Sequence, residues 1–173
     1  LKIKKTLPTE IHKILISVGG EDPTGLTNIA ESAFKNVKGV DGTDLDLTVV
    51  RDTIPNLSEK LAKFDLVVTH YGFTAFEAAA ANCAVILLGT TPLHIQLAKQ
   101  FGFACIMNGA ITEKTITEMI KYPNKLGCGI EMKKALSAQR LSLEDFMISL
   151  SNCTRRGCPI CSHTEQKTKN EPD

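Results

Sequence analysis

Five short apolar runs alternate with segments of helical periodicity, and this alternation limits the possible folds more than any other feature of the sequence. The apolar runs are KILISV, LDLTVV, FDLVVTH, CAVILLG and FACIM. The helical segments between them cover residues 26–37, 56–64, 74–82 and 94–102, and two more are expected over 112–122 and 131–150. Strands that are apolar on both faces and alternate with helices indicate a parallel sheet with both faces covered. The sequence therefore predicts an α/β fold, a doubly wound parallel sheet in a three-layer α/β/α arrangement.

Composition bounds the size, the partners and the location of the protein. A chain of 173 residues with 43% hydrophobic content can bury one α/β core. We expect this domain to span residues 1–150 and a polar tail to span 151–173. A net charge of +1 gives no basic field for nucleic acid. No stretch reaches the roughly 18 apolar residues that cross a bilayer, and the N-terminus lacks an apolar signal core. We expect a cytoplasmic protein with no nucleic-acid partner and no membrane span, and the start at Leu1 suggests a piece of a longer polypeptide.

Ligands of open α/β sheets bind at the carboxyl ends of the strands, where the topology reverses. Three loops are therefore candidates: Gly19-Gly20, residues 70–73 and residues 89–94. The first is glycine-rich, but it lacks the G-x-G-x-x-G pattern, and the acidic pair Glu21-Asp22 stands where a pyrophosphate needs bare backbone donors. A dinucleotide cofactor is disfavoured there. The turn has two interpretations, a ligand-binding turn or a tight turn in which glycine supplies a positive φ.

The second loop opens an alanine-rich helix and carries His70, Gly72 and Glu77. No acid precedes this helix, and the free N–H groups of a helix N-terminus suit a diphosphate. Thr74 and Glu77, however, have the spacing of a capping box, with Thr74 as N-cap and Glu77 as the third helical residue. By pattern alone, capping is favoured over a ligand role. His70 is either a phosphate or leaving-group contact or a hydrogen-bonded structural residue.

The third loop places polar residues near the mouth of the next strand. They are Thr90, Thr91, His94 and Gln96. Such groups could read sugar hydroxyls. An ordinary helix entry at Pro92 explains the same pattern.

Residues 13–107 resemble the C-terminal, donor-binding domain of GT-B-fold glycosyltransferases in the order and type of their motifs. The resemblance runs from ILISVGGEDP through FDLVVTHYGFTAFEAAAANCAVILLGTTPLHIQLAKQFG. The related enzymes are the UDP-N-acetylglucosamine transferase of peptidoglycan synthesis and the UDP-sugar hydrolase of pseudaminic acid synthesis. A Rossmann-like, GT-B C-terminal half is the fold that the resemblance implies.

The resemblance also implies a set of residues that contact the donor. They are Gly19, Gly20, His70, Gly72, Phe73, Thr74, Glu77, His94 and Gln96. The glycine turn would face an interdomain cleft, the backbone of residues 72–74 would meet the diphosphate, and Glu77 would bond the ribose hydroxyls. His94 and Gln96 would lie near the sugar or its phosphates.

The expected function is the nucleotide-sugar-binding half of a glycosyltransferase of surface polysaccharide synthesis, with a UDP-sugar favoured. In that family the catalytic base sits on the N-terminal half, so this half is incomplete alone and would bind donor without turnover. The implied protein partner is that N-terminal half or a separate subunit, and no cofactor is required. Two alternatives stay open: the C-terminal half of a nucleotide-sugar hydrolase, and a non-catalytic α/β interaction module.

The last cysteines form a separate motif. Cys158 and Cys161 make a C-P-x-C knuckle, which suits two thiolates on one zinc ion, with Cys153 and His163 as further candidate ligands. A single knuckle is half of a zinc site, and it resembles the opening of a zinc ribbon. Reduced thiols in a polar tail explain the pattern equally well.

Overall fold

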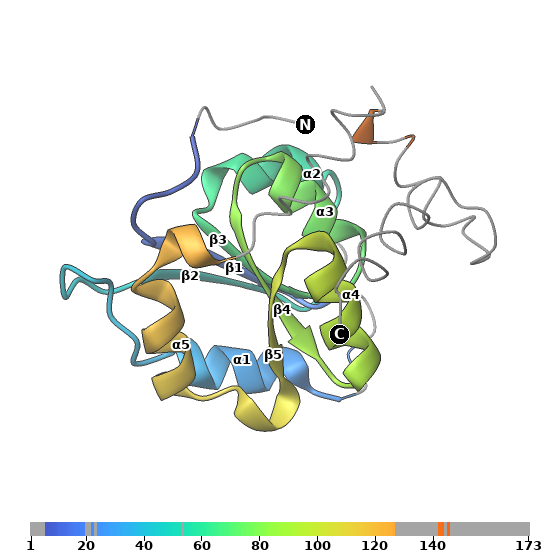
Figure 1. Cartoon of the computed structure of the whole chain (residues 1–173). Coiled ribbons are helices and arrows are strands. Elements are labelled where there is room, and N and C mark those ends of the chain that lie inside the picture. The colour runs from blue at the N-terminus through green and yellow to red at the C-terminus, as the bar shows by residue number, and fades with distance from the viewer. Residues whose placement is uncertain are drawn as a thin grey trace, which may run out of the picture.

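A single parallel sheet forms the centre of the molecule (Figure 1). The computed structural model describes residues 6–19, 22, 24–52, 54–126, 142, 143 and 145. The strands are β1 (Lys13–Ser17), β2 (Asp46–Val50), β3 (Leu66–His70), β4 (Ala84–Gly89) and β5 (Ala104–Met107). They are hydrogen-bonded in the order β2-β1-β3-β4-β5, and every neighbouring pair is parallel. Each strand coincides with one of the five apolar runs, so the predicted parallel sheet is confirmed.

The helices occupy the segments between the strands. They are α1 (Leu26–Phe34), α2 (Leu57–Lys60), α3 (Phe73–Ala80), α4 (Pro92–Phe101) and α5 (Glu113–Ile120), with short 3-10 turns η1 (Leu61–Lys63), η2 (Asn108–Ala110) and η3 (Pro123–Lys125). Five of the six expected helical segments thus contain a helix. The sixth, 131–150, lies almost entirely outside the described residues, and the tail 151–173 lies wholly outside them.

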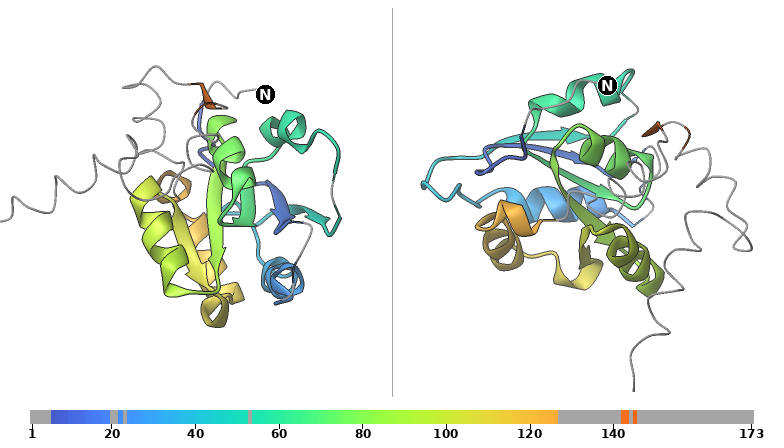
Figure 2. Two further views of the ribbon diagram at one scale, coloured as in Figure 1. Left: turned by 90° about the vertical axis from the view of Figure 1, so that its right-hand side faces the viewer. Right: turned by 45° about the horizontal axis from the view of Figure 1, so that its top comes forward.

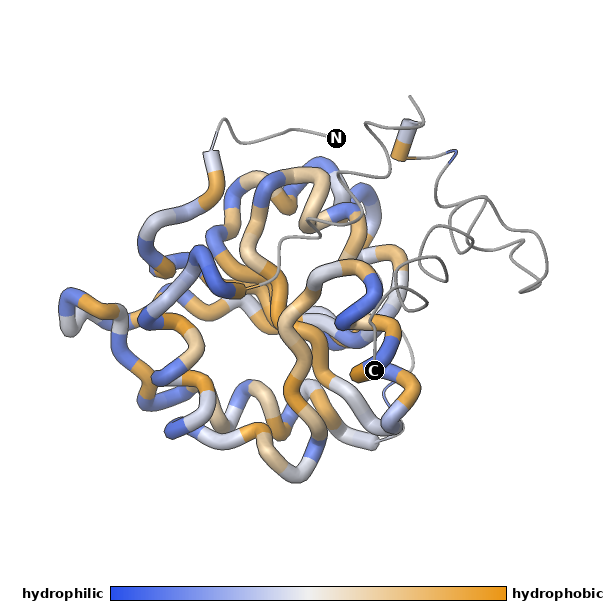
Figure 3. Tube along the Cα trace, viewed as in Figure 1, coloured by the Kyte–Doolittle hydropathy of each residue, from blue (hydrophilic) through white to orange (hydrophobic). Residues whose placement is uncertain are grey.

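The two faces of the sheet bury separate apolar clusters, because successive strand residues point to opposite sides. On one face, Ile14 and Ile16 pack with α1 and α5. On the other, Leu15 packs with α3, α4 and the η1 turn. Figures 1 and 2 show α1 and α5 together on one side and α2 and α3 on the opposite side. Figure 3 shows the apolar colour concentrated along the strands between them. The result is a three-layer α/β/α, Rossmann-like fold.

An aromatic cluster fixes α3 and the loop before it. The Phe76 ring, 2% exposed, meets the rings of Tyr71, Phe101 and Phe103 edge-on at centroid distances of 5.7, 5.3 and 5.5 Å. Each such pair contributes about 0.5–1.5 kcal/mol beyond its buried area. The cluster therefore holds the end of β3, α3 and α4 in one arrangement, and this arrangement positions the candidate site.

The described helices are all short, and α4 is the longest of them at ten residues. A helix that crosses a bilayer needs about 20 apolar residues. Within the part of the chain that the structure describes, no helix has the length and apolar character to cross a membrane.

Candidate functional site

Two of the predicted loops flank the point where the sheet topology reverses. β1 lies between β2 and β3, so the chain leaves β1 toward one side and later returns to the other. The crevice at the carboxyl ends of these two strands is the usual ligand site in sheets of this order. Gly19 follows β1 and His70 ends β3, so both loops lie at this carboxyl edge of the sheet. Gly20 lies outside the described residues.

The turn after β1 depends on a positive φ at Gly19, and the Asp22 carboxylate accepts hydrogen bonds from the start of α1. Gly19 has a φ of 104°, and no atom lies within 4 Å of the place where a Cβ would stand, so conformation requires the glycine. Asp22 Oδ1 accepts the N–H of Leu26 at 2.8 Å, and Oδ2 accepts the N–H of Thr27 at 2.7 Å. Burial alone would raise the pKa of Asp22, but hydrogen bonds from Thr27 and Leu26 outweigh it and lower that pKa. A phosphate at α1 would have to displace this carboxylate.

The N-terminus of α3 differs from α1 and from the predicted capping box. The N-cap is Gly72 rather than Thr74, and no side chain among the described residues accepts a hydrogen bond from the first turn. Thr74 is the second helical residue and Glu77 the fifth, so the position that a capping-box glutamate would take belongs to Ala75. The capping interpretation of Thr74 and Glu77 is therefore wrong. The helix begins earlier than the pattern implied because extended backbone at Gly72, with φ of 177°, leads directly from β3 into the first turn.

Gly72, the N-cap residue of α3, places no side chain beside the first turn of the helix. A Cβ added here would meet only His70, at 3.5 Å from Cε1 and 3.7 Å from Nδ1, which is ordinary van der Waals contact. Neither conformation nor crowding requires glycine at this position. Phe73, the first helical residue, is 54% exposed. A ligand can therefore approach the N–H groups of the first turn from solvent.

Glu77 lies on the outer face of α3, one turn beyond the helix start. Ala75, Phe76, Ala78 and Ala79 are buried, whereas Glu77 is half-buried. Within the described residues its carboxylate has no hydrogen-bond or ion-pair partner, and burial raises its pKa. Long helical side chains generally lean toward the helix N-terminus, so we expect this carboxylate to reach toward the first turn of α3.

His70, the last residue of β3, lies near His94 in the first turn of α4. Their ring centroids are 6.4 Å apart and the planes are at 78°. His94 Nδ1 accepts the backbone N–H of Thr90 at 3.1 Å, which places the proton of the neutral ring on Nε2. The pKa of His70 is lowered, first by burial and then by His94, while Asp22 opposes the shift. Burial of His70 thus favours the neutral form of its ring.

Gly89 makes this meeting possible. A Cβ at Gly89 would stand 3.0 Å from Met107 Sδ, 3.1 Å from Cys105 Sγ and 3.3 Å from His94 Cβ. The missing side chain lets the start of α4 lie close against β5. The sequence analysis did not single out this role, although a glycine as the last residue of an apolar strand is a visible signal of close packing.

The structure separates Gln96 from His94. Residues two apart leave a helix about 200° around its axis and do not face each other. Gln96 is exposed, whereas His94 is half-buried against His70. His94 thus joins the residues at the carboxyl edge, and the donor role of Gln96 stays a prediction.

Lysine and arginine are absent from the described parts of the three candidate loops. None of the described residues in 18–25, 71–77 and 90–96 is Lys or Arg. Arg51, which follows β2, is held in an ion pair with Glu31. Gly72 and Thr91, the N-cap residues of α3 and α4, make no side-chain capping hydrogen bond, and each helix N-terminus carries a partial positive charge.

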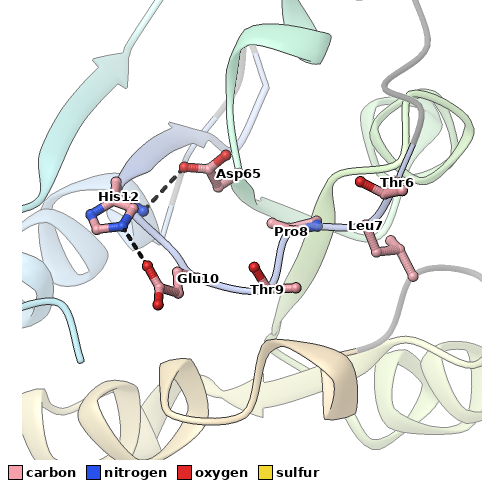
Figure 4. Close-up of a pocket in the computed structure, with 7 residues that line it drawn as sticks. All are labelled: Thr6, Leu7, Pro8, Thr9, Glu10, His12 and Asp65. Atoms are coloured by element: carbon pink, nitrogen blue, oxygen red, sulfur yellow. Dashed lines mark hydrogen bonds and ion pairs between the residues drawn. The ribbon is translucent and has the colours of Figure 1, made fainter. Parts of the chain in front are cut away.

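A hollow of about 500 Å³ lies at the opposite, amino edge of the sheet (Figure 4). Asp65 lines it, and its Oδ2 accepts the N–H of His12 at 3.1 Å and that of Lys13 at 2.9 Å. The His12 ring contacts Glu10, with Nε2 3.2 Å from Oε2. Asp65 thus ties the start of β1 to the start of β3. We assign these contacts to the fold.

The predicted zinc ligands, Cys153, Cys158, Cys161 and His163, lie outside the described residues. Among the residues that are described, no group of three or more His, Cys, Asp or Glu side chains could hold a metal ion. Zinc binding by the tail stays a prediction.

A comparison with protein-family models finds no family that matches this chain. No curated protein matches it either. The resemblance to glycosyltransferases therefore rests on the sequence motifs, and the fold and the site geometry carry the argument that follows.

Proposed function

We propose that this chain is the donor-binding half of a nucleotide-sugar glycosyltransferase of surface polysaccharide synthesis, with a UDP-sugar as the favoured ligand. One observation carries the proposal. The N-terminus of α3 opens without a side-chain cap at the switch point, and the partly buried Glu77 lies one turn further along the helix. The same position on α1 is filled by Asp22, so the diphosphate is assigned to α3.

The diphosphate binds over the first turn of α3. The N–H groups of Phe73 and Thr74 point along the axis toward it, and the helix end adds about half a positive charge. Gly72 carries no side chain, so none of its own atoms stands between the phosphate oxygens and these donors. Glu77 accepts hydrogen bonds from the ribose hydroxyls, because its carboxylate leans toward the same turn.

The chain's part in the reaction is to stabilise the leaving group. Negative charge grows on the nucleoside diphosphate as the bond to the sugar breaks, and donors already fixed at a helix terminus stabilise it without reorganisation. The catalytic base belongs to the N-terminal half or to a partner subunit. This chain alone therefore binds the donor and does not turn it over.

Ligand-observed NMR with UDP, GDP and CMP tests the proposal. We expect saturable binding with UDP preferred. The Glu77→Gln variant should weaken UDP binding by about 10- to 100-fold, the equivalent of one hydrogen bond to a charged group, about 1.5–3 kcal/mol. Glu59→Gln, an exposed carboxylate on α2, is the matched control and should bind as the parent does.

Failure of all three nucleotides to bind the folded protein would favour the interaction-module alternative. Equal affinity of the Glu77→Gln and Glu59→Gln variants would remove Glu77 from the site. The hydrolase alternative uses the same donor contacts, so it is separated from the transferase only by supplying the other half and assaying for free sugar.

A further inference from the structure

Two sulfur atoms converge beside Gly89, at the end of β4. The place where a Cβ of Gly89 would stand is 3.0 Å from Met107 Sδ and 3.1 Å from Cys105 Sγ. Cys105 and Met107 are two residues apart on β5, so their side chains leave the strand on the same face. Met107 is also the residue of β5 that pairs with Gly89. We call the Cys105 thiol and the Met107 thioether the sulfur pair.

The sulfur pair can be reached from solvent. β5 is an outer strand of the described sheet, and Cys105 and Met107 are each partly exposed. Cys105 is a free cysteine, and within the described residues its thiol has no hydrogen-bond partner. The other cysteine that the structure describes, Cys83, is buried and donates its S–H to the Leu61 carbonyl oxygen at 3.1 Å. Cys105 is therefore the one of these two thiols that can take a ligand.

His94 stands beside the sulfur pair but adds no ligand to it. Its Cβ is 3.3 Å from the same point beside Gly89, and its Nδ1 accepts the Thr90 N–H at 3.1 Å. The neutral ring then carries its proton on Nε2, so neither ring nitrogen has a free lone pair. A structural zinc ion requires four ligands. A soft monovalent ion prefers thiolate and thioether sulfur, and two such ligands suffice for it.

We propose that the sulfur pair is a site for a soft monovalent metal ion, Cu(I), held between Cys105 Sγ and Met107 Sδ. On binding, the thiol S–H bond breaks, its proton leaves to solvent, and a metal–thiolate bond forms. Met107 donates a sulfur lone pair, and no atom changes its oxidation state. The proposal does not rest on the nucleotide site.

The charge and the geometry of the sulfur pair both suit this ion. Thiolate and Cu(I) cancel, so the loaded site is as neutral as the free thiol, and its partial burial imposes little desolvation cost. Burial raises the pKa of the Cys105 thiol, so the ion has to displace a bound proton. Metal–thiolate bonds are about 2.3 Å long in zinc sites. The flexible Met107 side chain can bring its sulfur to a similar distance from the ion.

Titration of the full chain with silver(I) nitrate in chloride-free buffer tests the site. Silver(I) has the charge and the ligand preference of Cu(I) and is stable in air. The methionine methyl groups carry ¹³C, so the four methionines of the chain give four NMR reporters. Met107→Leu, which nearly conserves side-chain volume, identifies the Met107 resonance. Met119, which packs on the opposite face of the sheet, is the internal reference.

We expect the Met107 methyl resonance to shift and to saturate once silver exceeds the six thiols of the chain, while the Met119 resonance stays in place. Cys105→Ser should abolish the shift, because a hydroxyl is a poor ligand for a soft ion. Cys105→Ala gives a second variant with the same expected loss. Circular dichroism checks that each variant is folded.

Two control variants keep the sulfur pair and should keep the shift. Cys83→Ser removes the other described thiol and retains a donor to Leu61. The double variant Cys158→Ser with Cys161→Ser removes the C-P-x-C knuckle.

A Met107 resonance that stays in place at saturating silver would overturn the proposal. A shift that persists in both Cys105 variants, or that disappears with the knuckle, would place the ion elsewhere and equally overturn it. Simultaneous shifts of Met107 and Met119 would indicate a change of the whole fold and would contradict a local site. Nucleotide binding is measured separately, so none of these results decides the proposed function.

Discussion

Replacing Asp22 with alanine should destabilise the fold by about 1–2 kcal/mol at pH 7. The change removes two hydrogen bonds to the start of α1, from Leu26 at 2.8 Å and Thr27 at 2.7 Å. Loss of a helix-capping carboxylate costs about 0.5–2 kcal/mol, and hydrogen bonds to charged groups lie at the upper end. For a domain of this size, the melting temperature should fall by about 2–8 °C.

The effect should also depend on pH with a definite sign. The folded-state pKa of Asp22 is lowered, so its contribution is fully present above the ordinary value of 3.8 and is lost as pH falls through the folded pKa. Urea unfolding followed by circular dichroism, at pH 7 and at steps down to about pH 3, measures this. The difference between parent and variant should be constant from pH 7 to 5 and should shrink at the acid end.

The matched control is Asp52→Ala, at an exposed aspartate. Substitutions at such sites change stability by less than about 0.5 kcal/mol. Equal losses in the two variants, or a loss in Asp22→Ala that grows toward acid pH, would refute the assignment of Asp22 as the internal anion of α1.

Two further predictions test the helices and the core by the same unfolding assay. Thr74→Ala should be neutral or slightly stabilising because Thr74 is inside α3. Thr112→Ala should cost about 1 kcal/mol because the Thr112 hydroxyl caps α5, at 3.2 Å from the Thr115 nitrogen. A larger loss of stability in Thr74→Ala than in Thr112→Ala would restore the capping-box interpretation of Thr74. Phe76→Ala should cost about 3–5 kcal/mol because its buried ring joins three other aromatic rings; a loss below about 1 kcal/mol would contradict the packing described for α3.

The sequence predicted the strands well because each strand is a continuous apolar run that both helix layers bury. KILISV and CAVILLG contain β1 and β4 with errors of a residue at the ends. The start of α3 was predicted less well. The spacing of Thr74 and Glu77 satisfies the capping-box pattern wherever the helix begins, and the end of β3 together with extended backbone at Gly72 decides that point. Local pattern alone does not contain this information.

The contacts within the candidate site were beyond sequence reasoning for a different reason. The sequence placed His70 at a strand end and His94 near the mouth of the next strand, but their approach depends on β3 and β4 being neighbours and on the absence of a side chain at Gly89. The capping of the α1 N-terminus by Asp22 could have been predicted from the sequence, because an acidic residue in the turn before a helix is a visible capping signal. The sequence did not predict that the first turn of α3 would lack a capping side chain among the described residues.

The strand order also sets the course of folding. Leu66 of β3 pairs with Ile14 of β1 on one side and with Ala84 of β4 on the other. The second pairing closes a far shorter loop, and loop closure must be completed before such contacts stabilise the chain. The unit from β3 to β5, which carries both histidines and Glu77, should therefore assemble ahead of the docking of β1. The carboxyl edge between β1 and β3 is then complete only after the pairing that closes the longer loop, so we expect ligand binding to report on this later step of folding.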